Sequence, residues 1–245
     1  MLKLLIEVME NLDKYKDHSF TETEEKLLLM VHYTLYGNSL KEFNMKTAFE
    51  SIIRLSENKE IFEEVLEILN YKYNNLSVVS KKDRAMERSS LELHCTYTTD
   101  QILVALGKHT ADKKYNFQEG VLHVKERDLD IDAFFITLNK VENHYSPSTM
   151  YKDYAISSEL FHWQTQSKIS PETQTCERYI NHKKNNHKIL LFVRERKKDK
   201  GFTTPFTYLG TADYVRHYGR LTVNIVWRLH ESLPAGIEVK AEKAL

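Results

Sequence analysis

The stretch that decides the fold is KILLFVRE, residues 188–195, in which five consecutive positions are large and apolar. A run of this kind is typical of a β-strand that is covered on both faces. Other short segments are rich in β-branched and aromatic residues and are bounded by glycine, proline, asparagine or charge: 121–126, 133–139, 206–212 and 220–229. Together these patterns predict a closed or strongly curved β-sheet in the second half of the chain.

The first half follows a helical pattern instead. Its apolar residues recur three and four positions apart, as in 27–35 and 61–69, which is the spacing of one face of an amphipathic helix. All four prolines, and every glycine except Gly37, lie at or after residue 107, so turn-forming residues are concentrated in the second half. Thr21 followed by Glu24 predicts a capping box at one helix start. Four or five helices are therefore predicted before residue 95.

A polar stretch, VSKKDRAMERSS at 79–90, marks the expected boundary between the two patterns. Beyond it, one of Thr98, Thr99 and Asp100 is expected to cap a short helix, QILVALG, which Gly107 ends. We therefore predict an α+β fold. Residues 1–95 form an N-terminal α-helical bundle that serves as a coupling or interaction domain, and residues 96–245 form a mixed, barrel-like β domain.

The composition is that of an ordinary soluble globular protein. The chain has 245 residues and is 41% hydrophobic, enough for a core, and its 35 basic side chains balance 35 acidic ones. No apolar run approaches the roughly 20 residues of a membrane span, and acidic residues interrupt the apolar N-terminus, so a cytoplasmic location is expected. Cys95 and Cys176 are expected to be free thiols. A net charge of zero excludes a uniformly cationic protein, but charge can still be segregated on one face.

Residues 138–193 indicate a binding surface. Amides, hydroxyls and lysines surround six aromatic residues there, without helical or strand periodicity until the last residues: Tyr145, Tyr151, Tyr154, Phe161, Trp163 and Tyr179. From 182 to 200, eight lysines and arginines are accompanied by only Glu195 and Asp199. Rings that stack, groups that hydrogen-bond and cations that follow phosphates favour a polar, anionic ligand, and nucleic acid is the obvious candidate. Core or rim packing of the rings, and a solvated lysine-rich hairpin, are the alternatives.

An ordered series of motifs carries a resemblance to a known family. It runs LNK (138–140), YSPSTMYKDYAIS (145–157), LFHWQTQ (160–166), RYINHKK (178–184), ILLFVRERK (189–197), FTYLGTADYV (206–215) and IVWRL (225–229), followed by LPA. Residues 97–236 thereby resemble the C-terminal domain of SauUSI-like type IV, modification-dependent restriction endonucleases. The resemblance implies an SRA- or PUA-like reader that flips 5-methyl- or 5-hydroxymethylcytosine out of duplex DNA. The first half resembles the region that couples such readers to a motor.

In that family the reader follows a phospholipase-D-type nuclease and a helicase. These are the partners that the resemblance implies, either in one parent chain or as separate proteins, together with double-stranded DNA that carries modified cytosine. The 245 residues contain no Walker motif of a helicase and no HKD motif of such a nuclease. No enzymatic activity and no cofactor are therefore expected of this chain itself.

A protein that flips a base needs rings to replace the lost stacking and polar groups to bind the edge of the base. The rings expected to do so are Tyr145, Tyr151, Tyr154 and Trp163, and the polar candidates are Asn139, Asp153, Gln164 and Gln166. The alternatives are that Asp153 bonds local backbone and that the glutamines are solvated surface. The cations expected to contact the DNA backbone are Lys140, Lys152, Arg178, Lys183, Lys184, Lys188 and Arg216, with Arg220 as a further candidate.

Two other functions fit parts of the sequence. Glu195 and Lys197 form the E-x-K pattern of metal-dependent nucleases behind a strand, and Asp128, Asp132 or Asp153 would supply the further acidic ligand. The helical half alone fits a protein-interaction domain. No metal site is predicted, because the spacing of His162, Cys176, His182 and His187 matches no zinc motif. The alternating Asp128, Asp130 and Asp132 are expected to end a solvated strand rather than to bind a cation.

Overall fold

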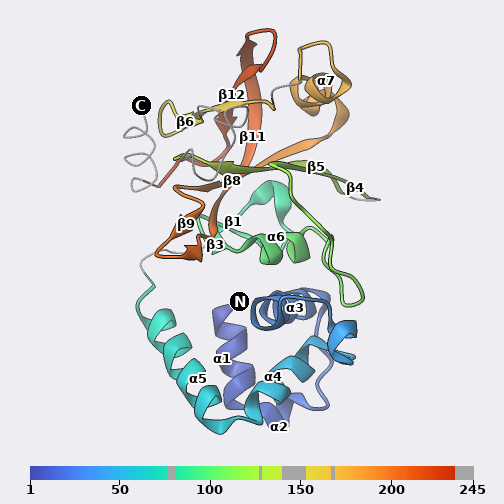
Figure 1. Cartoon of the computed structure of the whole chain (residues 1–245), viewed down its shortest axis with the longest axis vertical. Helices are drawn as coiled ribbons and strands as arrows, with labels where there is room; N and C mark the ends of the chain where they lie inside the picture. The colour runs from blue at the N-terminus through green and yellow to red at the C-terminus, as the bar shows by residue number, and fades with distance from the viewer. Residues whose placement is uncertain (77–80, 127–128, 140–152, 167–168, 235–245) are drawn as a thin grey trace. The chain divides into compact units, whose positions relative to one another are not determined.

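The computed structural model describes residues 1–76, 81–126, 129–139, 153–166 and 169–234 (Figure 1). The chain forms two compact units. The helical unit contains residues 1–82, 86–92 and 98–116, and the β unit contains residues 83–85, 93–97 and 117–245. The predicted α+β fold is confirmed. The predicted boundary at residue 95 stays a prediction, because short segments on either side of it alternate between the two units.

The helical unit is held together by the apolar faces of its helices. It contains α1 (Leu2–Glu10), α2 (Leu12–Tyr15), α3 (Glu22–Tyr36), η1 (Leu40–Phe43), α4 (Ala48–Ser56), α5 (Lys59–Asn74) and α6 (Thr99–Ala105). Val8, Leu28 and Ile52 belong to one buried cluster, which stabilises these helices more than their intrinsic propensity does. None of the helices in the described ranges is long and apolar enough to cross a membrane.

The helix starts follow the predicted capping pattern. Thr21 forms a full capping box with Glu24 at the start of α3, and Thr98 forms one with Gln101 at the start of α6. In each, the threonine hydroxyl accepts from a backbone N–H of the first turn that has no partner within the helix. In the described residues between α5 and α6 lie four short elements, β1 (Lys81–Lys82), η2 (Arg84–Met86), β2 (Glu92–Leu93) and β3 (Thr96–Tyr97).

The β unit is built on an eight-stranded mixed sheet. Its spatial order is β4 (Val121–Glu126), β5 (Leu129–Thr137), β8 (Lys188–Arg194), β11 (Phe206–Tyr218), β12 (Asn224–Leu229), β7 (Leu160–Gln164) and β6 (Tyr154–Ala155), and β3 (Thr96–Tyr97) pairs with β11. The β5–β8 pair is parallel and the others are antiparallel. Strands β9 (Lys198–Asp199) and β10 (Phe202–Thr203) form a separate pair, and α7 (Gln174–Ile180) and η5 (His182–Asn185) precede β8.

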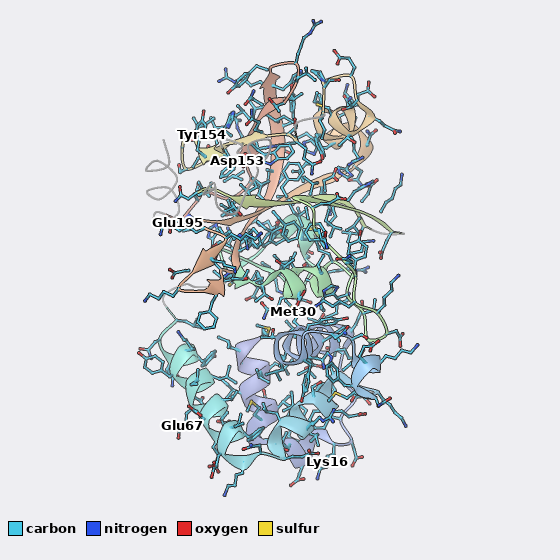
Figure 2. All side chains as sticks on the ribbon, viewed as in Figure 1. Lys16, Met30, Glu67, Asp153, Tyr154 and Glu195 are labelled. Carbon is cyan, nitrogen blue, oxygen red and sulfur yellow. The ribbon has the colours of Figure 1, made fainter. Side chains whose placement is uncertain are left out.

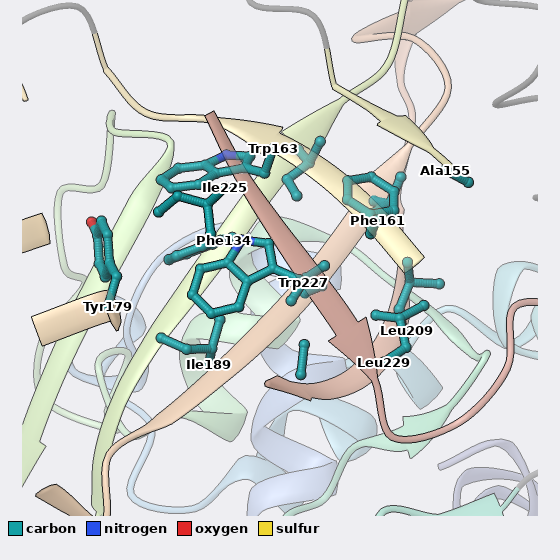
Figure 3. Packing of buried hydrophobic residues seen from close by; sticks show 14 of the residues in the cluster. Phe134, Ala155, Phe161, Trp163, Tyr179, Ile189, Leu209, Ile225, Trp227 and Leu229 are labelled. Atoms are coloured by element: carbon teal, nitrogen blue, oxygen red, sulfur yellow. The ribbon is translucent and has the colours of Figure 1, made fainter. Parts of the chain in front are cut away.

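The sheet curls around its core although its strand order is open. Phe134 of β5 stacks on Trp163 of β7, with ring centroids 4.1 Å apart, and meets the edge of Trp227 of β12 at 5.6 Å (Figure 3). Three strands separate β5 from β7 in the sheet order, so this contact requires a strongly concave inner face. The predicted barrel-like shape is thus loosely matched, while among the described residues β4 and β6 remain the two ends of the sheet.

Strand β8 is covered on both faces, as its apolar run predicts. Ile189, Leu191 and Val193 join the core inside the curl, and Phe192 stacks on the opposite face against Tyr208 at 4.9 Å. All five apolar residues of the strand are buried. This strand is therefore the centre from which both layers of the β unit are packed.

A buried carboxylate and a glycine fix the adjoining part of β11. Asp83 accepts hydrogen bonds from the Tyr208 hydroxyl at 2.8 Å and from the Thr211 backbone N–H at 3.1 Å. Gly210 between them has a φ of +92°, and a Cβ added there would lie 2.6 Å from Cδ2 of Leu93. Only glycine fits this conformation and this close approach.

Candidate nucleic-acid interface

Strand β7 has two chemically different faces. Phe161 and Trp163 belong to the core cluster, and because successive side chains alternate along a strand, His162 and Gln164 project from the other face. The outward side of β7 thus carries an imidazole and an amide where the inward side carries only hydrocarbon and indole. This polar side is the starting point of the site.

Cross-strand pairing extends this polar side over four strands. His162 pairs with Tyr154 of β6 and with Val226 of β12, and Val226 in turn pairs with Arg216 of β11. Gln164 pairs with Asn224, which pairs with Tyr218. Residues paired directly in antiparallel strands share a face. We call the surface formed by Tyr154, His162, Gln164, Asn224, Tyr218 and Arg216 the aromatic face; Figure 2 labels Tyr154, with Asp153 before it, at its β6 edge.

The rings of the aromatic face are in contact with one another. Tyr154 stacks on His162 with centroids 4.5 Å apart and planes 16° apart, and Tyr218 lies 6.0 Å from His162. Burial raises the pKa of the Tyr154 hydroxyl, and the neighbouring Tyr218 raises it further, so Tyr154 remains a neutral phenol at physiological pH. Tyr218 is 50% exposed, so a large part of its ring is open to a ligand.

Hydrogen bonds hold the polar groups at the same place. Asp153, only 4% exposed, accepts from the Gln164 backbone N–H at 2.9 Å, and the Gln164 side-chain amide donates to the Thr222 hydroxyl at 3.2 Å. Through this bond Asp153 binds the backbone of the neighbouring strand β7, eleven residues along the chain, and not the backbone of its own turn. Gln164 links β7 to the turn between β11 and β12, and its amide is half-buried at the aromatic face.

The β11–β12 hairpin carries exposed cations and an exposed apolar residue beside the aromatic face. Arg216, Arg220 and Leu221 are all exposed, Leu221 to 76%. Gly219 turns the chain with a φ of +89°, and a Cβ there would lie 3.0 Å from the Thr222 carbonyl oxygen. Arginines suit phosphates, and an exposed aliphatic side chain on such a hairpin suits insertion between bases.

The structure brings together only some of the residues predicted for base binding. Asp153, Tyr154 and Gln164 lie together at the aromatic face. Gln166 is exposed just beyond β7, whereas Asn139 follows β5, where its N–H donates to the Glu195 carbonyl oxygen at 2.8 Å. Tyr145 and Tyr151 lie outside the described residues.

The predicted stacking role of Trp163 does not fit its position. Trp163 is 5% exposed, stacks on Phe134 and meets the edge of Tyr179 at 5.7 Å (Figure 3). A ring so enclosed has no open face for a base, so we correct its role to core packing. Tyr218 of β11, two strands away in the sheet order and on the other face, offers the exposed ring instead.

The predicted DNA-backbone cations divide into free and engaged groups. The Arg178 guanidinium makes two hydrogen bonds to the buried Asp132, at 2.7 and 3.0 Å, and the Lys188 ammonium donates to the Ala85 carbonyl oxygen at 2.6 Å. Both are structural, and we correct their predicted role. Lys183 forms an ion pair with Asp213 at 2.7 Å, while Lys184 and Arg216 have no ion pair within the described part of the chain. Lys140 and Lys152 lie outside that part.

Two of the acidic ligands suggested for the alternative nuclease site, Asp132 and Asp153, are engaged elsewhere in the described part of the chain. Asp132 pairs with Ile189 in the β5–β8 register, and Glu195 lies six residues further on, about 20 Å away at about 3.3 Å per residue. Asp132 is bound by Arg178, and Asp153 by the Gln164 backbone. Asp128 lies outside the described residues. Of the suggested acidic partners that the structure describes, Asp132 lies far from Glu195, and Asp153 is bound to the backbone of β7.

Sequence reasoning missed two features. Tyr218 was not singled out, although its position three residues before an exposed Leu221 and next to Gly219 marks a hairpin tip. A cluster of His123, Asp130 and His187 was missed as well, because its members come from three separate segments. Only the strand register brings these three side chains together.

The fold and the aromatic face define an α+β protein whose β unit presents rings, amides and cations on one side of a curled sheet. Residues 91–237 match the family described as Domain of unknown function (DUF3427), and since this is more than half of the chain, the protein belongs to that family. Comparison with curated protein sequences gives no match.

Two crystal structures of Arabidopsis thaliana SUVH6 in complex with SAM are similar to the chain. Form 1 is 12% identical with a TM-score of 0.38 and is matched over 98% of this chain. Form 2 is 13% identical with a TM-score of 0.41 and is matched over 90% of it. The match covers 42% of the SUVH6 chain in each case. A likeness at this level carries no argument about function.

Proposed function

We propose that this chain recognises 5-methyl- or 5-hydroxymethylcytosine in double-stranded DNA by flipping the base. It would serve as the specificity module of a type IV restriction system in which a helicase and a phospholipase-D-type nuclease carry out the catalysis. The observation that carries the proposal is the aromatic face, with a half-exposed Tyr218, a half-buried amide at Gln164 and exposed arginines on the adjoining hairpin.

The chemistry of this face suits an extruded base. Taking one base out of the stack costs a few kcal/mol, and stacking on a protein ring returns about 1–3 kcal/mol. Tyr218 supplies such a ring, and Tyr154 supports it from behind through His162. The Gln164 amide can both donate to and accept from the edge of a base. Arg216 and Arg220, both exposed on the adjoining hairpin, would bind the phosphates near it.

The link to restriction rests on the sequence resemblance. The motifs that resemble SauUSI-like enzymes span residues 97–236, nearly the same range as the family match at 91–237. The strand that bears LFHWQTQ is β7, and the motif FTYLGTADYV lies on β11, two of the strands of the aromatic face. We assign this chain the reading step and no bond cleavage.

The test compares three duplexes that differ at a single cytosine, which is plain, 5-methylated or 5-hydroxymethylated. Binding of the full chain is measured by fluorescence anisotropy, and extrusion of the base by a fluorescent base analogue opposite or beside the target. We expect tighter binding of a modified duplex together with a fluorescence rise. Equal affinity for all three duplexes, or a target base that stays stacked, would overturn the proposal.

A point variant ties the selectivity to the aromatic face. Tyr218→Ala should weaken binding of the modified duplex by roughly 5- to 150-fold, the equivalent of about 1–3 kcal/mol, and should affect plain duplex much less. The matched control is Tyr71→Ala on α5, because Tyr71 is also exposed and lies in the helical unit. Adding Mg²⁺ to the same samples tests the nuclease alternative, since nicking of the duplex would contradict a pure reader.

A further inference from the structure

Three metal-binding side chains meet on the strands β4 and β5 and at the start of β8. His123 lies on β4, Asp130 on β5, and His187 immediately precedes β8. The register pairs Lys125 with Asp130 and Ile131 with Lys188, so the three residues are neighbours across the sheet. One nitrogen of each histidine and one oxygen of Asp130 all lie within 4.8 Å of one another.

The donor set and its spacing suit a zinc-like cation. Two imidazoles and one carboxylate are ligands that Zn²⁺ and its neighbours in the transition series accept in catalytic and open sites. Ligand atoms about 2.1 Å from a tetrahedral ion stand about 3.4 Å apart. Nε2 of His123 is 3.4 Å from Oδ1 of Asp130, while Nδ1 of His187 is 2.6 Å from the same oxygen. The second distance is a hydrogen bond, and it would have to widen by about 0.8 Å to reach the spacing of two ligands on one ion.

The surroundings of His187 match those of a metal ligand. Its other ring nitrogen, Nε2, lies 2.8 Å from Oδ2 of Asp132, which is fully buried and held by two hydrogen bonds from Arg178. Metal-bound histidines almost always donate their second N–H to a carboxylate, a backbone carbonyl or water, which fixes the ring. Nδ1 is thereby directed at Asp130 and His123. Arg178, predicted as a DNA contact, takes part in this support instead.

The cluster is open to small ligands. It lies in a cavity of about 700 Å³ whose lining includes His123, Asp130, His187 and Lys125. An ion held by three side chains would keep at least one coordination position for water or a further ligand from this side.

We propose that His123, Asp130 and His187 bind one divalent transition-metal ion of the zinc class, with Asp132 and Arg178 as the residues that position His187. The site is additional to the aromatic face and does not depend on the proposed reading of DNA. Its residues lie at the β4–β5 side of the sheet, whereas the aromatic face lies on β6, β7, β12 and β11.

The experiment is calorimetric titration of the full chain, free of any histidine tag and treated with a chelator, with Zn²⁺ and with Co²⁺. We expect one ion per chain. His123→Gln is the main variant, because the His123 side chain is 36% exposed and its loss leaves the core intact. This variant should lower the affinity for the ion by at least about tenfold, because even the loss of a residue that only hydrogen-bonds to a metal ligand has an effect of that size. Circular dichroism verifies that the variant is folded.

Two further variants make the outcome decisive. His18→Gln removes another exposed histidine, in the helical unit, and should leave the affinity unchanged. Asp132→Asn keeps the shape of the positioning residue and should lower the affinity by about 10- to 100-fold with the stoichiometry unchanged. The proposal is overturned if the folded wild-type chain binds neither ion, or if His123→Gln binds as tightly as the wild type, or if His18→Gln loses binding to the same extent.

Discussion

Replacing Arg216 and Arg220 together by glutamine should flatten the salt dependence of DNA binding. Both side chains are exposed on the β11–β12 hairpin, and neither forms an ion pair in the part of the chain that the structure describes. Their charges are therefore available to phosphates. Glutamine keeps much of the length and hydrogen-bonding capacity of arginine, so the change isolates the charge.

The size of the effect follows from counterion release. Each phosphate neutralised contributes about 0.9 to the slope of log K against log salt, so two lost contacts should reduce its magnitude by about 1.8. Between about 50 and about 200 mM salt, this amounts to a roughly 12-fold smaller loss of affinity than in the wild type. Because phosphates are common to every sequence, plain and modified duplexes should be affected alike.

The assay is fluorescence anisotropy with one labelled duplex at four or more salt concentrations. Arg54→Gln with Arg88→Gln is the matched control, since both are exposed arginines of the helical unit and undergo the same chemical change. The control pair should keep the wild-type slope. If the hairpin variant keeps it as well, or if both pairs lower it equally, the hairpin is not where this protein contacts the DNA backbone.

Three further predictions concern stability. Trp163→Ala should lower the free energy of unfolding by about 3–5 kcal/mol, because it leaves a cavity in the core against Phe134. Urea denaturation measures this change, and a loss below about 1 kcal/mol would contradict the packing. Gly210→Ala should lower the free energy of unfolding by more than about 1 kcal/mol in the same assay, because of the positive φ and the close contact with Leu93. A variant as stable as the wild type would show that β11 relaxes to accommodate the methyl group. Burial lowers the pKa of His32 below its ordinary value of 6.5, so that on acidification the unfolded chain binds a proton before the folded chain does. The free energy of unfolding should therefore fall as the pH drops below about 6.5, by up to about 1.4 kcal/mol per pH unit. The fall should be smaller in the His32→Gln variant.

Local patterns predicted local structure well. The capping box of Thr21 and Glu24 involves residues three apart, so the sequence alone contains all that forms it. The apolar run of β8 likewise predicts a strand buried on both faces. The prediction holds whichever apolar residues cover the strand, so it needs no knowledge of its partners. Trp227 lies in the predicted strand at 220–229, and it is fully buried.

The site required information that no local pattern holds. Trp163 was taken for a base platform because amides surround it in the sequence, yet the alternation of Phe161, His162 and Trp163 along β7 turns it inward. Its covering ring, Phe134, comes from a distant strand, and only the curl of the sheet brings the two together. The sequence alone indicates that Arg178 is a free cation, but in the structure α7 places it beside Asp132, which it binds. Long-range pairing, not composition, decided these roles.

Both tryptophans of the protein, Trp163 and Trp227, sit in a single cluster around Phe134, and the helical unit has none. Indole emission should therefore monitor the β unit alone, while far-ultraviolet dichroism is dominated by the helices. Recording the two signals in one denaturation series would separate the melting of each half without cutting the chain. Coincident curves would mean that the halves lose their structure in one cooperative step.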